Sequence, residues 1–589
     1  MPYLDLQSFL RDLERAGELR RVPVEVDPEL EITEIVTRVI REDGPALLFE
    51  RVRGAPYPLA INILGSSRRI EMALGRQPGE IGRELVGLLE RLNPPSPRSL
   101  FESRGQLWRM LAARASDHRG RAPAQEIVEE PPDLSSLPAL KCWPDDGGRF
   151  ITLPLVITHD PLTSARNVGI YRMQVHDARR TGMHWQLQKG GGLHYYRAEQ
   201  EGRPLELAAV LGGDPALILA AATPLPEGFD EVAFSGILRG KPLPMVRSRT
   251  LGLRVPPHAE FILEGVVPPA ERIDEGPFGD HLGHYSDSAP FPVFHVRAIT
   301  RRRDPVYPAA VVGLPPQEDR AIGDAVQEIT GPLIRLIHPE VRDLWAYFET
   351  GFHNLLVVSV ESRYTKEPMK TALGLMGSGQ LSLAKCVVLV EAGTDVRDFR
   401  AVLQEVRKNF RAAEDFLLLP GVPLDTLDFT SYKMHLGSKM VIDATRAGKP
   451  PPTPPPPAAA AFDPRALAPE ALSWRLWDDT LLAVRVSGNG RAALERLVRA
   501  PELEGLKLLA VVSEDVDIED RTALLWGIFT RFDPARDLFF PHMTLYGASP
   551  VYRGTLGIDA THKPGYPKRL EMTPEVVRRV DQRWGEYFP

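Results

Sequence analysis

Two short stretches, a little over a hundred residues apart, carry residue types whose spacing suits chemistry. The first reads Asn-Val-Gly-Ile-Tyr-Arg at 167–172, and the second reads Glu-Gly-Pro-Phe-Gly-Asp at 275–280. In the first stretch, the amide oxygen of Asn167 suits a hard cation, and Arg172 supplies a planar cationic fork. Gly169 between them lets the backbone come close to a ligand. The first stretch therefore offers both a cation ligand and a fork that fits a carboxylate.

The second stretch places two carboxylates on either side of a turn. Pro277 stiffens this turn and glycines punctuate it, so Glu275 and Asp280 are held on a short, stiff loop. If the two stretches fold together, they form an acid–base pair bridged by Arg172. Such an arrangement perturbs carboxylate pKa values and is a common way to position a proton donor. Either stretch alone is a weak signal, and the pair is a stronger one.

The composition is that of a globular protein with several domains. The chain has 589 residues, 43% of them hydrophobic and 25% charged, and its net charge is −7. This charge argues against nucleic-acid binding, which usually needs a basic face. We expect no signal peptide and no membrane span, because no basic segment precedes an apolar core and no apolar run nears about 18 residues. Cys142 and Cys386 lie far apart without CxxC spacing, which excludes a disulfide scaffold and a thiolate zinc site and suits a reducing cytoplasm.

The elements that position the two stretches change character along the chain. The start alternates helices and strands, with a helical apolar stripe over 32–40. Residues 151–158 and 168–175 read as half-buried strands, two of several between about 110 and 320. Only two helices are expected among these strands, one at 215–222 and one around 230–234. Many short strands with few helices predict a barrel or sandwich whose mouth can hold a cofactor.

Beyond residue 320 the alternation of helices and strands returns, and part of it is repeated. A Pro- and Ala-rich spacer follows at 447–464 and is expected to be semi-rigid. After it, four segments recur in the same order at an offset of about 116–126 residues. For example, 355–360 is echoed by 481–486. Four matches in one order indicate a duplicated βαβα unit.

Several motifs of the chain resemble those of UbiD-type decarboxylases. The resemblance covers most of residues 1–445 and returns over the terminal copy. It is carried in combination by the segments 167–175, 223–226, 233–240, 275–285, 291–294, 437–440 and 442–445. It implies removal of CO2 from an aromatic or unsaturated acid with prenylated FMN and a divalent metal, Mn2+ or Mg2+, with K+ as a further candidate ion. It also implies a homo-oligomer and a flavin prenyltransferase that supplies the cofactor.

With this resemblance, the expected fold class is α+β and multidomain, with a central split β-barrel that binds flavin. The predicted parts are an N-terminal α/β domain (1–110), the barrel with prenyl-FMN and metal (111–320), a C-terminal α/β domain (321–446), a Pro/Ala-rich linker (447–464) and a second copy of the α/β unit with a closing helix (465–589). We expect the second copy to be structural, because neither reactive stretch recurs in it.

The resemblance also implies roles for individual residues. Asn167 and Glu231 correspond to metal ligands, an oxygen-donor pair suited to Mn2+ or Mg2+. Asp280 corresponds to the proton donor, while Arg172 orients the substrate carboxylate and keeps Glu275 ionised. The residues that correspond to flavin contacts are Ile170, Tyr171, Arg172, His184, Trp185, Gln186, Lys189, Gly190 and Lys439, the last near the flavin phosphate.

The sequence departs from the family pattern at one metal ligand. A histidine usually precedes the basic-Gly-Gly step, where this chain has Gln188. An amide oxygen is a weaker ligand than imidazole. His184 and His194 are alternatives for the third ligand, and the sequence does not decide between them. His281 and His284 are spaced i, i+3, but no third ligand lies nearby in the sequence, so no metal role is expected for them.

The duplicated C-terminal region resembles that of the futalosine-route decarboxylase of menaquinone biosynthesis, which acts on a dihydroxynaphthoate acid. We therefore expect a cytoplasmic carboxy-lyase that acts on a small hydroxynaphthoate-type acid. One alternative is the polyprenyl-4-hydroxybenzoate decarboxylase of ubiquinone biosynthesis, whose prenylated substrate would bring the enzyme close to a membrane. The other alternative is a non-catalytic flavin-binding or assembly subunit.

Overall fold

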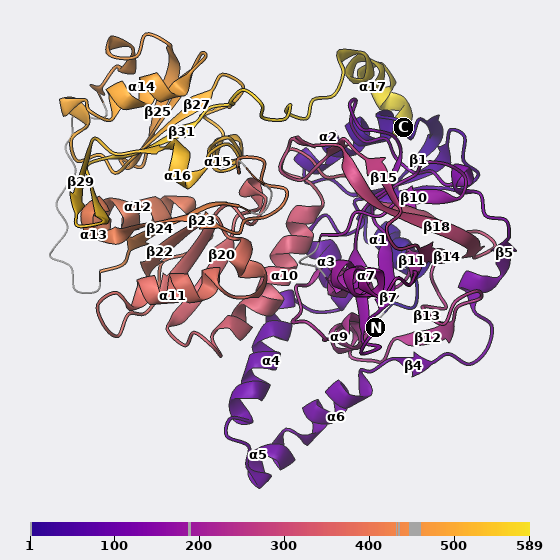
Figure 1. The fold of residues 1–589 in the computed structure, drawn as a ribbon. Helices are drawn as coiled ribbons and strands as arrows, with labels where there is room; N and C mark the ends of the chain where they lie inside the picture. Colours follow the sequence, from indigo (N-terminus) through magenta and orange to yellow (C-terminus); the bar gives the residue numbers. More distant parts are fainter. Residues whose placement is uncertain (1–2, 187–189, 432, 434–435, 447–460) are drawn as a thin grey trace. The chain divides into compact units, whose positions relative to one another are not determined.

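The computed structural model describes residues 3–186, 190–431, 433, 436–446 and 461–589. The chain forms two compact units, Met1–Thr330 with Lys568–Pro589, and Gly331–Pro567 (Figure 1). None of the described helices has the length and apolar character needed to cross a membrane.

The first unit begins with a small sheet covered by helices. Its strand order is β1-β2-β3-β19, with bounds Leu19–Val26, Ala46–Val52, Leu59–Ile61 and Tyr307–Ala309. The helices that follow these strands or precede them are α1 (Leu6–Arg15), α2 (Glu31–Arg41) and α3 (Ser67–Leu74). The apolar stripe predicted over 32–40 is buried along α2. The closing helix α17 (Pro574–Tyr587) packs on α2, where the hydroxyl of Tyr587 donates to Glu31 Oε1 at 2.6 Å.

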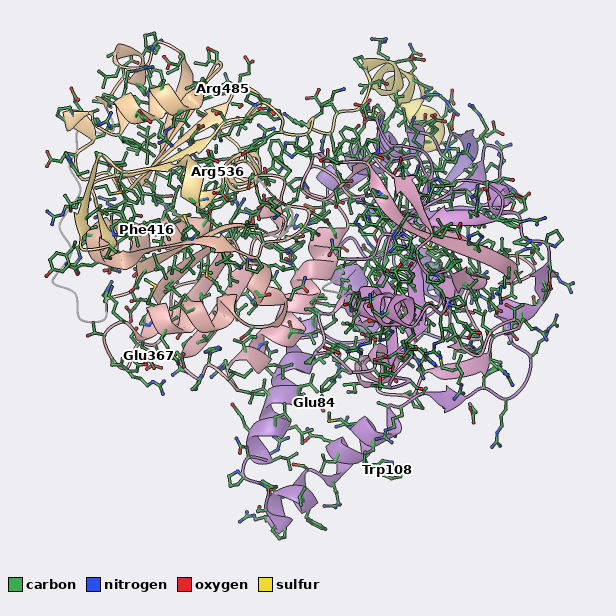
Figure 2. The ribbon with its side chains drawn as sticks, viewed as in Figure 1. Glu84, Trp108, Glu367, Phe416, Arg485 and Arg536 are labelled. Carbon is green, nitrogen blue, oxygen red and sulfur yellow. The ribbon has the colours of Figure 1, made fainter. Side chains whose placement is uncertain are left out.

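Three consecutive helices extend from this sheet: α4 (Pro78–Arg91), α5 (Pro97–Glu102) and α6 (Arg104–Ala112). Figure 1 shows α5 at the tip, with α4 and α6 as the two arms. Trp108 on α6 is 71% exposed (Figure 2). The sequence pattern did not predict α5 and α6, because their apolar residues lie on exposed faces and form no buried stripe.

An eight-stranded sheet forms the middle of the first unit. Its main path is β10-β18-β14-β11-β7-β8, and β15 and β5 branch from the long strand β18. The bounds are β5 Ile127–Glu129, β7 Leu155–His159, β8 Arg166–Ile170, β10 Arg180–Gly182, β11 Leu205–Leu211, β14 Phe261–Val267, β15 Arg272–Glu275 and β18 Ala289–Arg301. The pairings among the described strands do not close into a ring. The fold class is the predicted one, α+β and multidomain.

Three helices accompany the sheet: α7 (Gly190–Gln200), α8 (Pro215–Ala222) and α9 (Glu231–Arg239). The last two were predicted, and α7 was not, since it begins with three glycines, the weakest helix formers after proline. The strand predicted over 168–175 is interrupted. β8 ends at Ile170, β9 covers Met173–Gln174, and Tyr171 and Arg172 lie in the gap between them.

The second unit contains two five-stranded sheets of the same topology. The first has the order β20-β21-β22-β24-β23, and the second has the order β25-β26-β27-β31-β28. In each, an antiparallel pair leads into parallel strands and the last strand is antiparallel. The strands are β20 Val341–Ala346, β21 Leu356–Val360, β22 Cys386–Glu391, β23 Phe416–Val422, β24 Gly437–Ala444, β25 Ala471–Trp477, β26 Leu481–Val486, β27 Leu508–Ser513, β28 Leu538–Phe539 and β31 Leu556–Ala560. The duplication inferred from four sequence matches is therefore a duplication of fold.

The helices of the two copies correspond as well. In the first copy, two helices follow the third strand: α12 (Phe399–Asn409) and α13 (Ala412–Asp415). In the second copy, two helices also follow the third strand: α15 (Arg521–Phe529) and α16 (Pro534–Asp537). The first-copy helix α11 (Glu367–Met376) and the second-copy helix α14 (Gly490–Leu497) each connect the second strand to the third.

The two copies contact each other reciprocally. The turn η3 (Phe348–Thr350), between the first two strands of copy one, packs against α15 of copy two, where Arg521 pairs with Glu349 at 2.8 Å. The equivalent turn of copy two packs against α12 of copy one, where Arg407 pairs with Asp479 at 2.9 Å. Each copy thus presents the same turn to the same helix of its neighbour.

A second pair of contacts repeats this reciprocity. Lys385, just before β22, lies 5.2 Å from the ring centroid of Phe532 in copy two. Lys507, just before β27, donates to the carbonyl oxygen of Phe410 in copy one at 2.9 Å. Because both lysines and both phenylalanines occupy matching places in the two copies, the copies are related by an approximate two-fold axis, as in an isologous dimer.

Candidate active site

Arg172 joins the two reactive stretches directly. Its Nε donates to Glu275 Oε1 at 3.0 Å, its Nη1 to Asp280 Oδ2 at 2.5 Å and its Nη2 to Ser286 Oγ at 3.1 Å. The guanidinium also lies 4.5 Å from the ring centroid of Phe278. The side chains of Arg172 and Glu275 are 9% and 0% exposed, so this bridge is shielded from solvent.

The fold explains how residues far apart in the sequence meet here. Glu275 ends β15, where it pairs in register with Ala289 of β18. The loop that follows is held by two side chains that the sequence did not single out. Gln174 Oε1 accepts from the backbone N–H of Gly276 at 2.7 Å, and Asp146 Oδ1 accepts from that of Gly279 at 2.8 Å.

Both carboxylates are ionised in this arrangement. Burial raises the pKa of Glu275, but the hydrogen bond from His184 and the charge of Arg172 outweigh it, so the pKa lies below its ordinary value. Burial also acts to raise the pKa of Asp280. The hydrogen bond and charge of His281 and the charge of Arg172 have the larger effect, so the pKa of Asp280 lies well below its ordinary value. The site therefore holds two buried negative charges around one arginine.

Two histidines complete this network. His184 Nδ1 lies 2.9 Å from Glu275 Oε1, which places a predicted flavin contact against the buried carboxylate. His281 Nδ1 lies 2.6 Å from Asp280 Oδ1, and the backbone N–H of His281 donates to the same oxygen at 2.7 Å. His194 is not part of this network. Its Nδ1 lies 2.9 Å from the Oγ1 of Thr158, which pairs in register with Asn167, and burial lowers the pKa of His194 to about 4.

The two predicted metal ligands lie next to each other. Asn167 is buried on β8, and Glu231 is the first residue of α9. Glu231 Oε2 accepts from the backbone N–H of Val168 at 2.9 Å, which holds the carboxylate beside Asn167. Burial raises the pKa of Glu231 to about 7.

This pair fits a hard divalent cation. A buried carboxylate with a raised pKa gains from a nearby positive charge, and an amide oxygen adds a second hard ligand. No group of three or more His, Cys, Asp or Glu side chains with metal-binding geometry occurs in the described part of the chain. Gln188, the third candidate, lies outside the described residues.

The predicted flavin contacts line the region between β8 and α7. The hydroxyl of Tyr171 accepts from the backbone N–H of Gly191 at 3.1 Å. The buried Nε1 of Trp185 has no hydrogen-bond acceptor among the described residues, so it is a donor suited to a bound polar group. Gly190 begins α7, and a Cβ there would lie 2.1 Å from Asn167 Oδ1. Glycine is needed here because the backbone passes directly over the Asn167 amide.

Three further residues were predicted to contact the flavin: Ile170, Gln186 and Lys189. Ile170 is half-buried at the end of β8, in register with Leu155, and Gln186 is half-buried after Trp185. Lys189 lies outside the described residues. These roles stay predictions.

Lys439 belongs to the second unit, on β24. Its Nζ donates to the carbonyl oxygens of Ser382 and, at 3.1 Å, Ala384. Burial lowers its pKa to about 8. The register of β24 and β31 puts Thr555 at the matching place in copy two. The expected contact of Lys439 with a flavin phosphate stays a prediction.

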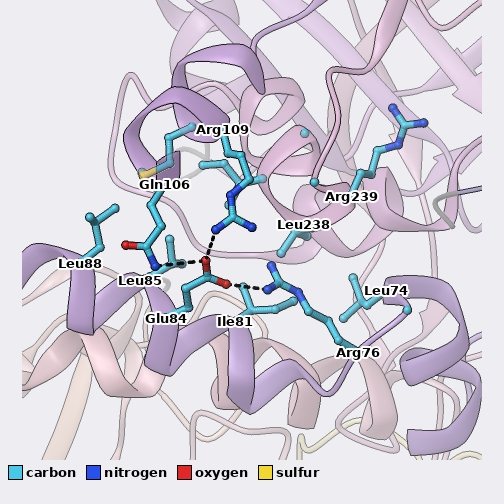
Figure 3. Close-up of a pocket in the computed structure, with 15 residues that line it drawn as sticks. Leu74, Arg76, Ile81, Glu84, Leu85, Leu88, Gln106, Arg109, Leu238 and Arg239 are labelled. Carbon is cyan, nitrogen blue, oxygen red and sulfur yellow. Dashed lines mark hydrogen bonds and ion pairs between the residues drawn. The ribbon is translucent and has the colours of Figure 1, made fainter. Parts of the chain in front are cut away.

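A cavity of about 280 Å³ lies in another part of the first unit (Figure 3). It is lined by α4, α6 and the end of α9, and Glu84 at its side accepts from Arg76 at 2.7 Å and from Arg109 at 3.2 Å. None of the predicted site residues lines it. We assign no role to this cavity in the chemistry of the Arg172 network.

Family models match most of the chain. The Rift-related domain of 3-octaprenyl-4-hydroxybenzoate carboxy-lyase matches residues 116–315, its N-terminal domain matches 10–89, and its C-terminal domain matches 320–444 and 476–560. The fold, the site and these matches together define an enzyme of the carboxy-lyase class. The chain belongs to the UbiD family of carboxy-lyases.

Relatives and solved structures agree with this family. A protein of Chlamydia pneumoniae that is named as one of the subunits of 4-hydroxybenzoate decarboxylase is 36% identical over 565 residues, 96% of this chain and 95% of the relative. An uncharacterised protein of Archaeoglobus fulgidus is 44% identical over 448 residues, 76% of this chain and 92% of the relative.

Among solved structures, vanillic acid decarboxylase of Sedimentibacter hydroxybenzoicus matches with a TM-score of 0.68 and 27% identity, covering 78% of this chain and 94% of that one. HmfF of Pelotomaculum thermopropionicum in complex with FMN matches with a TM-score of 0.64 and 28% identity, covering 78% and 99%.

Proposed function

We propose that this protein removes CO2 from an aromatic acid with prenylated FMN as its cofactor. The observation that carries the proposal is the buried bridge from Arg172 to Glu275 and Asp280. Support for the cofactor comes from HmfF, which has been solved in a form with bound prenylated FMN and is 27% identical.

The chain's own residues bind, orient and protonate the substrate. When bound, prenylated FMN supplies an electron sink for the carbanion left by departing CO2, a task side chains do poorly. Arg172 orients the substrate carboxylate and keeps Glu275 ionised. Asp280 returns a proton to the carbon that has lost CO2. The side chain of Glu275 is 0% exposed, so its ion pair with Arg172 lies away from bulk water, which strengthens that interaction.

Asn167 and Glu231 would hold Mn2+ or Mg2+ in this proposal, with K+ as a further candidate ion. Their neighbouring positions on β8 and α9 give two oxygen ligands of the kind these cations prefer. Held by these two side chains, the cation would supply positive charge that offsets the Glu231 carboxylate and a cofactor phosphate.

We propose a hydroxynaphthoate-type acid of menaquinone biosynthesis as the substrate. The support is the duplicated C-terminal region. A hydroxybenzoate is the second candidate, favoured by the name of the Chlamydia pneumoniae relative. A homo-oligomer, a flavin prenyltransferase as the cofactor source and a cytoplasmic location stay predictions. Proximity to a membrane is expected only for a prenylated substrate.

The test begins with the cofactor. The chain is produced with and without a flavin prenyltransferase, and the ultraviolet-visible spectrum and the mass of the released flavin are measured. The loaded enzyme is then offered dihydroxynaphthoate, 4-hydroxybenzoate and polyprenyl-4-hydroxybenzoate, and CO2 release is followed. Release from one acid only after co-production supports the proposal. A chain that binds no flavin under either condition contradicts it.

A further inference from the structure

Asp280 is held by donors on both of its oxygens. Arg172 donates to Oδ2, while the backbone N–H and the imidazole of His281 contact Oδ1 at 2.7 and 2.6 Å. These donors stabilise the carboxylate and not the carboxylic acid. The residue proposed to deliver a proton is therefore held as a carboxylate, so it must first receive that proton from a neighbour or from water.

His281 is placed to be that neighbour. Its side chain is 21% exposed, against 12% for Asp280, so solvent reaches His281 more readily than the acid. Asp319, the first residue of α10 (Asp319–Ile334), also interacts with this imidazole. Burial raises the pKa of Asp319 to about 6, and the charge of His281 opposes that rise. The imidazole thus interacts with two carboxylates, an arrangement that favours its protonated form.

We propose that His281 stores the proton that Asp280 delivers, so that the two side chains act as one relay. The relay serves the decarboxylation proposed above and rests on it. Among the described residues, the charged groups that face His281 include Asp280 on its own loop, Asp319 on α10 and, behind Asp280, Arg172. The two carboxylates favour the imidazolium form of His281. Arg172 binds the other oxygen of the Asp280 carboxylate.

The proton moves in two transfers that conserve atoms and charge. As electron density builds on the substrate carbon, the N–H bond at His281 Nδ1 breaks and an O–H bond forms on Asp280 Oδ1. That O–H bond then breaks as a C–H bond forms on the carbon that has lost CO2. His281 regains one proton from water through its exposed edge, so one carboxylate and one proton become CO2 and the product.

The charge state of His281 is tested without any cofactor. The full chain is labelled with ¹⁵N-histidine, and its ring-nitrogen resonances are recorded at pH 7. We expect one imidazolium signal to vanish in His281→Asn, and the same signal to shift toward the neutral form in Asp280→Asn. A neutral His281 at pH 7 in the wild-type chain overturns the proposal.

The transfer itself is tested in the loaded enzyme. His281→Asn keeps an N–H donor near Asp280 but cannot release its proton, so decarboxylation should fall about 10²-fold or more with the flavin spectrum unchanged. Added imidazole should restore part of the rate to His281→Ala, which a purely structural role of His281 would not allow. The wild-type rate should fall as the pH rises through the titration of this imidazole, and His281→Asn should lose that dependence.

His295 provides the matched control, since its Nε2 also lies 2.9 Å from a carboxylate oxygen, that of Glu271. His295→Asn should keep the wild-type rate and pH dependence. If the wild type decarboxylates and His281→Asn does so at the same rate with the same pH dependence, the relay is wrong and the function stands. If the loaded wild type releases no CO2 from any acid, the function itself fails, whatever the NMR result.

Discussion

Asp280 shows how much one proton matters at the scale of a residue. Replacing it with asparagine keeps the size of the side chain and removes its ability to give a proton. Asp280→Asn should keep flavin and stability while decarboxylation falls roughly 10²–10⁴-fold. Flavin absorbance and CO2 release, measured on the same preparation, check this. A near wild-type rate would move the donor role to Glu275.

Glu275 positions its neighbours, because its Oε1 contacts both Arg172 and His184. Glu275→Gln should therefore weaken activity by loosening the position of Arg172. The expected signature is a poorer KM together with a poorer kcat, since Arg172 orients the substrate. An unchanged KM would show that Arg172 does not depend on this partner.

Glu318 predicts a dependence of stability on pH. It is buried, accepts from the backbone N–H groups of Asn62 and Leu64 at 3.0 and 2.8 Å, and burial raises its pKa to about 7. Because the folded chain binds this proton more tightly than the unfolded chain, the stabilisation is complete below about pH 4.5 and is lost as the pH rises through about 7.

Glu318→Gln mimics the protonated form and should remove this dependence. Relative to the wild type, the variant should gain on the order of 1–3 kcal/mol in free energy of unfolding between pH 5 and pH 8. Urea unfolding at the two pH values checks this, with exposed Glu42→Gln as the control. A difference that stays constant with pH would rule out the titration of Glu318.

At the scale of elements, the start of α7 sets the space around Asn167. A Cβ at Gly190 would meet Asn167 Oδ1 at 2.1 Å, so Gly190→Ala must displace that amide. We expect weaker binding of Mn2+ and flavin with little loss of secondary structure. Metal analysis and flavin titration measure this. Gly105→Ala on α6 is the matched control, because a Cβ there meets nothing within 4 Å.

The contact of Arg172 with Glu275 and Asp280 could be predicted from the sequence, while the roles of these residues stay predictions. The pairing of Arg172 with Glu275 and Asp280 followed from residue types and a family pattern. The helix α7 did not, because three successive glycines oppose helix formation, and the helix is supported by contacts with β7, β8 and β11.

In the sequence, His281 was considered only as a metal ligand, and its contact with Asp280 was not predicted, for a related reason. A histidine beside an aspartate in a loop has no periodic pattern, and its meaning depends on long-range contacts. The approach of α10, which brings Asp319 near the imidazole, is not visible in the local sequence. The place of His281 near Asp319 therefore depends on the fold and cannot be predicted from the residue type alone.

At the scale of the whole molecule, the second copy should not be a second active site. Neither reactive stretch recurs in it, and Thr555 stands where copy one has Lys439. Full loading should therefore give one flavin per chain, measured from flavin absorbance and protein concentration on the same sample. Two flavins per chain would contradict this.

The reciprocal contacts between the copies have a consequence for how the second unit responds to dilution. Two separate chains joined by such an interface dissociate at low concentration. Here both copies belong to one chain, so the effective concentration of one copy near the other does not change with dilution. The melting temperature of the intact protein should therefore not change with dilution. Once a protease site inserted within 447–460 is cut, the same melting temperature should fall as the sample is diluted.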